Sequence, residues 1–191
     1  MEKGSTGSAV VKSIVLVALA ALIVMGLYLM FTRGKRSGGE ETYDLTVVDE
    51  ITTTNLEKNY PADPRKVVEL YAKTMQTLYK AEYSKDQQIQ MISTLAGIMD
   101  DELLANQGNF AQSIINEVNN RRENDYSIPS FVVQTKDPEE VTVNGTRMCD
   151  VDCLFSLRHG TVTNATYYQF VLRKDESGHW KILGWTLKED E

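Results

Sequence analysis

The stretch Val141–Leu157, VTVNGTRMCDVDCLFSL, contains a tight turn followed by a long alternating segment. Asn144-Gly145 supplies the positive φ angles that a two-residue hairpin turn requires. Beyond this turn, apolar or small side chains recur at every second residue, which is typical of a strand with one buried face. We therefore predict a β-hairpin whose second strand has a core face formed by Cys149, Val151, Cys153, Phe155 and Leu157.

The two cysteines of the chain, Cys149 and Cys153, lie on this strand. Their spacing puts them on one face, about 13 Å apart, whereas a disulfide needs Cα atoms within about 7 Å. A zinc site would need further ligands nearby, and the only histidines, His159 and His179, flank separate turns. We expect two free buried thiols and no metal site.

The alternation continues toward the C-terminus. Tyr168, Phe170 and Leu172 form a second apolar set, and a turn at residues 175–178 leads into the last strand. The expected strands lie around Phe131–Val133, Val141–Val143, Cys149–Leu157, Tyr167–Arg173 and Trp180–Leu187.

The preceding half of the domain carries helix signals. Asp63-Pro64 matches an N-cap followed by proline at the first helical position, and that helix extends to about Ala81. Ser84–Gln87 is a capping box, and Asn109–Gln112 is a looser version of one that opens a helix ending near Glu123. The apolar faces expected for these three helices are Val67, Tyr71, Met75 and Leu78; Ile89, Ile92, Ala96 and Met99; and Phe110, Ile114 and Val118.

Helices followed by consecutive antiparallel strands predict an α+β domain over residues 59–191. Residues 33–58 form a polar linker and an extended segment, in which Leu45–Val48 is either a short strand or extended chain. The linker itself, at residues 34–41, is rich in glycine and charge.

The run Ser13–Thr32, SIVLVALAALIVMGLYLMFT, holds twenty residues without a charge. At about 1.5 Å per residue, such a helix covers the roughly 30 Å core of a bilayer. A cleaved signal peptide would have only about 7–15 apolar residues and small residues at its end, whereas Leu29–Phe31 are bulky. A buried core helix is the other alternative, and it is rare at a terminus. We expect an uncleaved transmembrane helix at 13–32 after a short tail at 1–12, which makes the lipid bilayer a partner.

The orientation of this helix depends on its flanking charges. Lys3 and Lys12 precede it, and Arg33, Lys35 and Arg36 come after it, so the basic flanks are nearly balanced. A short tail before an apolar helix is typical of signal anchors, which export the domain on their C-terminal side. We favour a single-pass protein of the cell membrane with an extracytoplasmic domain, and a cytoplasmic domain is the alternative.

Charge excludes one class of partner. Beyond Thr32 the chain has 18 basic and 26 acidic residues. A nucleic-acid surface needs a basic stripe, so we expect no nucleic-acid binding.

The closing segment Gly178–Trp185, GHWKILGW, completes a pattern that resembles the nuclear-transport-factor-2-like superfamily (cystatin-like, SnoaL-like) over about residues 60–190. The resemblance implies a strongly curved sheet that wraps around helices to form a cone with an open mouth. The whole chain also resembles uncharacterised single-pass membrane proteins of Gram-positive bacteria that carry such a domain, on the residues Asn59–Pro61, Pro64–Tyr71 and Asp101–Asn106. That family has no assigned activity.

The superfamily includes isomerases and dehydratases, which need a carboxylate or histidine base in the cone facing tyrosine or acid donors. Both histidines are expected at strand ends, and Asp150 and Asp152 on the face opposite the cysteines. Asp100 and Asp101 fall at a helix end, where we expect them to be solvated. The aromatic residues that could reach a pocket, although such residues usually belong to the core, are Tyr71, Tyr79, Tyr167 and Tyr168.

We therefore assign no catalytic, cofactor-binding or metal-binding residue and expect no cofactor. The chain is interpreted as a non-catalytic domain of one of two kinds: a binding module whose cone holds a small apolar or peptide ligand at the membrane surface, or an assembly domain that pairs with a second copy or another envelope protein. A small-molecule enzyme of isomerase, dehydratase or hydrolase type that uses the cone pocket is the alternative. Two or more ionisable groups facing the interior would favour the enzyme, whereas a filled apolar interior would leave only assembly.

Overall fold

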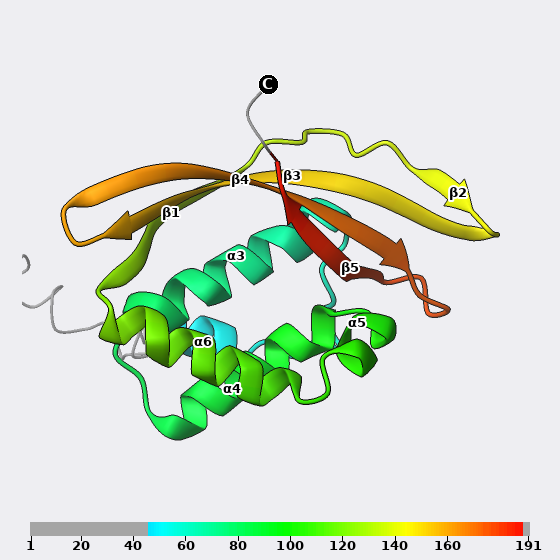
Figure 1. Cartoon of the computed structure of the whole chain (residues 1–191). Coiled ribbons are helices and arrows are strands. Elements are labelled where there is room, and N and C mark those ends of the chain that lie inside the picture. The colour runs from blue at the N-terminus through cyan, green and yellow to red at the C-terminus, as the bar shows by residue number, and fades with distance from the viewer. Residues whose placement is uncertain (1–45, 189–191) are drawn as a thin grey trace, which may run out of the picture. The chain divides into compact units, whose positions relative to one another are not determined.

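The computed structural model describes residues 46–188. The predicted membrane helix at Ser13–Thr32, the tail before it and most of the linker segment lie outside these residues. Within residues 46–188, no helix is both long enough and apolar enough to cross a bilayer. The chain divides into a unit at Met1–Asp44 and a unit at Leu45–Glu191, and the described residues belong to the second. In it, helices lie on one side of a curved antiparallel sheet, so the α+β class is confirmed (Figure 1).

The described helices precede the sheet, and each begins at a side-chain cap. Asp63, Ser84 and Asn109 cap the helices predicted from them, and the Ser84–Gln87 capping box is confirmed. The helices are α2 (Val47–Thr52), α3 (Pro64–Lys80), α4 (Lys85–Ile98), α5 (Asp101–Asn106) and α6 (Phe110–Glu123).

Two short helices differ from the expectation. Val47 and Val48, expected in a strand or extended chain, open α2, because Thr46 and Asp49 form a capping box. The six-residue α5 is not predicted from the sequence. None of its residues is buried, so the segment has no apolar stripe that would indicate a helix.

The predicted face of α4 is also wrong in part. Ile89 is 61% exposed, whereas Met91 and Leu95 are fully buried. Apolar residues on α4 are numerous enough to form two overlapping stripes, and packing selects the one centred on Met91, Ile92, Leu95 and Ile98.

The sheet has the predicted hairpins. Its order is β1-β3-β4-β5, all antiparallel, with β2 also pairing with β3. The strands are β1 (Tyr126–Val133), β2 (Val141–Val143), β3 (Thr146–His159), β4 (Val162–Lys174) and β5 (Trp180–Leu187). β1 begins before the expected Phe131 and includes Pro129, which is tolerated because β1 lies at an edge and its register shifts between Ser127 and Ser130.

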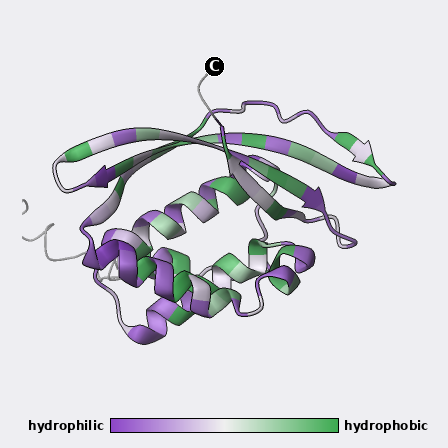
Figure 2. Cartoon of the chain, viewed as in Figure 1, coloured by the Kyte–Doolittle hydropathy of each residue, from purple (hydrophilic) through white to green (hydrophobic). Residues whose placement is uncertain are grey.

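Hydrophobic and hydrophilic residues alternate along β3 and β4 (Figure 2), and the burial patterns of these strands separate an inner face, toward the helices, from an outer face. The predicted inner residues from Cys149 to Phe155 are buried, as are Phe170 and Leu172, and Leu157 is half-buried. Asn144 and Gly145 have the positive φ angles, 51° and 84°, that the predicted turn requires. Both cysteines are free, and burial raises the pKa of each thiol to about 12.

Candidate ligand-binding site

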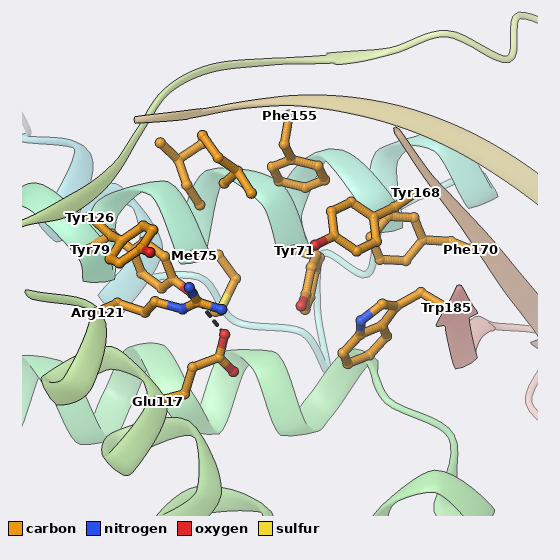
Figure 3. Close-up of a pocket in the computed structure, with 12 residues that line it drawn as sticks. Tyr71, Met75, Tyr79, Glu117, Arg121, Tyr126, Phe155, Tyr168, Phe170 and Trp185 are labelled. Carbon is orange, nitrogen blue, oxygen red and sulfur yellow. Dashed lines mark hydrogen bonds between the residues drawn. The ribbon is translucent and has the colours of Figure 1, made fainter. Parts of the chain in front are cut away.

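A cavity of about 110 Å³ lies between α3, α6 and the inner face of the sheet (Figure 3). Helix α3 contributes three of its side chains from positions four residues apart, so they lie along one stripe of the helix. The lining residues are Tyr71, Met75, Tyr79, Glu117, Arg121, Tyr126, Ile128, Phe155, Leu157, Tyr168, Phe170 and Trp185.

Aromatic rings form most of the cavity wall. The Tyr71 ring lies 5.2 Å from that of Phe170 and 5.3 Å from that of Trp185, measured between centroids. Phe155 meets Tyr168 edge to face at 5.6 Å. Offset and edge-to-face contacts of this kind are the favourable arrangements of aromatic pairs, and they give the cavity a largely apolar wall.

Three of the four tyrosines named from the sequence line this cavity. Tyr71, Tyr79 and Tyr168 do so, whereas Tyr167 is the neighbour of Tyr168 on β4 and belongs to the outer face. Burial raises the pKa of the Tyr71, Tyr79 and Tyr168 hydroxyls, so these three stay protonated at neutral pH. The cavity therefore contains hydrogen-bond donors in an apolar surrounding.

Two charged side chains of α6 complete the lining. Glu117 is exposed, and its Oε1 accepts a hydrogen bond of 2.7 Å from the Tyr79 hydroxyl. The guanidinium carbon of Arg121 lies 4.8 Å from the centroid of the Tyr126 ring. Figure 3 shows both side chains reaching the cavity from α6. Because Glu117 is both exposed and part of the lining, the cavity opens to solvent here, and we call Glu117 and Arg121 the rim.

Sequence reasoning missed the rim. Polar residues on an amphipathic helix are ordinarily solvated, and nothing local distinguishes these two. A signal existed in their spacing, since Glu117 and Arg121 are three and seven residues after buried Ile114 and therefore border the apolar stripe of α6.

The other ionisable residues named from the sequence lie elsewhere. His159 ends β3 and stacks on Tyr126 at 4.3 Å, and His179 precedes β5 and stacks on Tyr60 at 4.1 Å. Both histidines thus lie at strand ends, as predicted. Asp150 is exposed on the outer face of β3, and Asp152 accepts a hydrogen bond of 2.8 Å from Lys188.

Asp100 is a correction, because it is buried rather than solvated. Its side chain is 7% exposed and accepts hydrogen bonds from Arg173, one of them 2.9 Å long from Nε. Glu102 accepts a further bond of 2.9 Å from Arg173, and Asp100 also caps α5. We call these three residues the Asp100–Arg173 tie. Asp101, by contrast, is exposed as expected.

No cluster of three or more histidine, cysteine, aspartate or glutamate side chains suited to a metal ion occurs within residues 46–188. The cavity accordingly presents an apolar pocket with tyrosine donors and one charge of each sign at its rim, and these groups can hold and orient a small ligand.

The chain belongs to a protein family described as a domain of unknown function, DUF6715, which matches residues 1–185. As the resemblance implied, this description names no activity. No curated protein matches the chain.

Solved structures with a similar chain path include an IcmL-like type IV secretion system protein of Legionella pneumophila, at 16% identity and a TM-score of 0.40, over 68% of this chain and 96% of that one. The putative transfer protein TraH of a Gram-positive conjugative plasmid is similar at 13% identity and a TM-score of 0.37, over 67% and 95%. The intermembrane-space region of the chloroplast protein ARC6 is similar at 12% identity and a TM-score of 0.35, over 67% and 98%.

Proposed function

We propose that the domain is a binding module that holds one small apolar group in the cavity beneath the sheet. The observation that carries this proposal is the size of the cavity together with its aromatic lining. An apolar cavity of about 150 Å³ holds a benzene molecule, whereas pockets for drug-sized ligands measure about 300–1,000 Å³. The 110 Å³ present here suit a single ring or a short branched chain.

The finer fold assignment is part of this proposal. We infer a cone of the nuclear-transport-factor-2-like type, in which the mouth of the cone is the opening beside α6. The curved sheet, the helices against its inner face and the cavity between them support this assignment (Figure 1).

Location is a further part of the proposal. The apolar run Ser13–Thr32 anchors the chain in the cell membrane of a Gram-positive bacterium, and the domain is exported. Full-length protein should stay in the membrane fraction after alkaline and high-salt washes, and protease added to cells without their wall should digest the domain. Recovery in the soluble fraction contradicts the anchor, and protection from protease contradicts export.

Binding is tested with toluene, a neutral probe of the right size, by saturation-transfer NMR on the full-length chain. Leu157→Trp fills the cavity and should abolish the signal. The matched control is Leu154→Trp on the same strand, because Leu154 does not line the cavity, and its signal should persist. The proposal fails if toluene does not bind, or if both variants bind it equally.

An assembly role is compatible with this site, with a second copy or another envelope protein supplying the apolar group as a side chain. Under that proposal, Leu157→Trp should also weaken self-association or the capture of the envelope partner. Sedimentation velocity of the full-length chain in detergent, compared with the Leu154→Trp control, measures the first of these effects.

One observation favours the enzyme as a second candidate. The hydrogen bond between Tyr79 and Glu117 places a carboxylate beside a phenol in the cavity lining, and Arg121 adds a cation. These three groups meet the criterion of two or more ionisable groups facing the interior, which favours catalysis. Glu117 is exposed, however, and a solvated carboxylate is a weak base. Turnover of a small ketone or ester that disappears in Glu117→Gln, with the fold intact, would establish catalysis.

A further inference from the structure

We propose that the cavity and its rim together bind a free α-amino acid with an apolar side chain. This inference rests on the proposed binding function and specifies the ligand. The side chain enters the aromatic cavity, the α-ammonium group meets Glu117, and the α-carboxylate meets Arg121.

The spacing of the rim fits such a zwitterion. Glu117 and Arg121 are four residues apart on α6, so their Cβ atoms are about 5–6 Å apart on one face. Both side chains reach the same cavity (Figure 3). The ammonium and carboxylate groups of an amino acid are both bonded to its α-carbon. A ligand whose α-carbon lies at the rim therefore presents both charges to Glu117 and Arg121 while its side chain points into the cavity.

The rim charges also retain bonding capacity. Glu117 accepts one hydrogen bond from Tyr79, and an ionised carboxylate has further lone pairs for an ammonium group. Arg121 lies over the face of Tyr126, an arrangement that leaves its in-plane N–H donors available. Among residues 46–188, no side-chain acceptor is hydrogen-bonded to the Arg121 guanidinium. A carboxylate can accept two parallel bonds from it.

The neighbouring arginine shows the contrast. Arg122 donates to the backbone oxygens of Leu78 and Ala81, at 3.1 and 2.9 Å, and so joins α6 to the end of α3. The hydrogen bonds of Arg122 therefore stabilise the packing of the two helices, whereas Arg121, one residue earlier, faces the cavity. The structure thus supplies a structural arginine and an available one side by side on the same helix.

Cavity size sets the preference among amino acids. A volume of about 110 Å³ accommodates a leucine, methionine or phenylalanine side chain, whereas alanine would leave much of the aromatic wall without contacts. We therefore expect affinity to rise at least tenfold from alanine to leucine or phenylalanine.

The test is calorimetric titration of the full-length chain with four matched probes: phenylalanine, phenethylamine, 3-phenylpropanoate and toluene. Phenylalanine should bind at least tenfold more tightly than each singly charged analogue. Arg121→Gln should bring phenylalanine to the level of phenethylamine, and Glu117→Gln should bring it to the level of 3-phenylpropanoate. The control Glu123→Gln removes an exposed carboxylate of α6 that does not line the cavity, and it should change nothing.

The outcomes separate the two proposals. If toluene and phenylalanine bind equally and the rim variants have no effect, the amino acid proposal is overturned and the apolar binding module stands. If none of the four probes binds, both proposals fail. If phenylalanine binds with the expected preference but binding survives both rim substitutions in folded variants, as checked by circular dichroism, its site lies elsewhere and the inference is overturned.

Discussion

The charges at the cavity rim and those of the Asp100–Arg173 tie are arranged in opposite ways. In the tie, a buried carboxylate and an arginine satisfy each other, and the backbone N–H of Asp100 donates to the Ile182 oxygen at 2.9 Å. At the rim, Glu117 bonds to a neutral tyrosine and Arg121 lies over an aromatic ring. The two arrangements separate charges that hold the fold from charges that can receive a ligand.

The partner of each charged residue therefore indicates its role in this domain. Hydrogen bonds to Asp100, the largest cause, raise the pKa of Arg173, and the tie fastens α5 to the end of β4. If Glu117 and Arg121 each had a charged partner, they would hold the fold together in the same way as the Asp100–Arg173 tie. Because their partners are uncharged, the rim should contribute little to stability and much to binding.

The largest effect is expected at Phe170, which lines the cavity and lies on β4 three residues before Arg173 of the tie. Phe170 is 1% exposed and contacts Tyr71, Phe155 and Trp185. Phe170→Ala should lower the free energy of unfolding by about 3–5 kcal/mol, the usual range for a buried phenylalanine. Urea denaturation measures it.

The matched control for Phe170 is Val171→Ala, the next residue on the same strand, which is half-buried on the outer face. It should cost about 1 kcal/mol or less. A loss under about 1 kcal/mol for Phe170→Ala itself would mean that the two faces of the sheet are exchanged.

The next largest effect tests the tie. Arg173→Met leaves the buried Asp100 carboxylate without its cation and should cost about 2–4 kcal/mol, because an uncompensated buried charge is strongly destabilising. Glu102→Gln removes the 59% exposed partner and should cost under about 1 kcal/mol. If Asp100→Asn restores none of the loss in the Arg173→Met background, the tie does not act as a charge pair.

A smaller effect is expected from the thiols on the inner face between these two regions. Burial raises the pKa of Cys149 and Cys153 to about 12 in the folded protein, above the unfolded value of 9. Their contribution to stability is therefore complete below about pH 9 and is lost as the pH rises toward 12. The free energy of unfolding, measured between pH 7 and 11, should fall less steeply with rising pH in the double variant Cys149→Ala/Cys153→Ala than in the unsubstituted protein.

The same thiols provide an independent check by chemical labelling. Both should react with Ellman's reagent at pH 8 only after the protein is unfolded, because thiolate is the reactive form. Rapid labelling of folded protein, or a disulfide between the two, would contradict their place on the inner face of β3.

The strands could be predicted because residues 149–157 alternate with a single possible assignment of faces. Helix α4 could not be oriented in the same way, since Ile89 and Met91 are both apolar and only packing selects between them. The local pattern determines which face of an element is buried when only one orientation buries its apolar side chains. It fails when two orientations bury nearly the same number of them.

The sites were harder to predict than the strands, for a related reason. Asp100 is separated from Arg173 by 73 positions, and no local pattern indicates that the fold brings them together. Glu117 and Arg121 lie on a helix that was correctly predicted, but their value as a site comes from a cavity built by four strands and a second helix. The role of each of these charged residues depends on which residues the tertiary structure places beside it, and a single sequence does not show those neighbours.

The smallest effect on the free energy of unfolding is expected at the rim. Its size tests whether the rim charges differ in role from those of the Asp100–Arg173 tie. Glu117→Gln keeps an oxygen that accepts the Tyr79 hydrogen bond, and Arg121→Gln removes only a partly exposed cation–π contact, so each should change the free energy of unfolding by less than about 1 kcal/mol. A double-mutant cycle between them should give a coupling energy near zero, whereas the cycle for Asp100 and Arg173 should give at least about 1 kcal/mol. Strong coupling at the rim would mean that Glu117 and Arg121 already neutralise each other in solution. A zwitterion would then have to break that pair before binding, so the rim would belong with the tie as part of the structure rather than with the cavity.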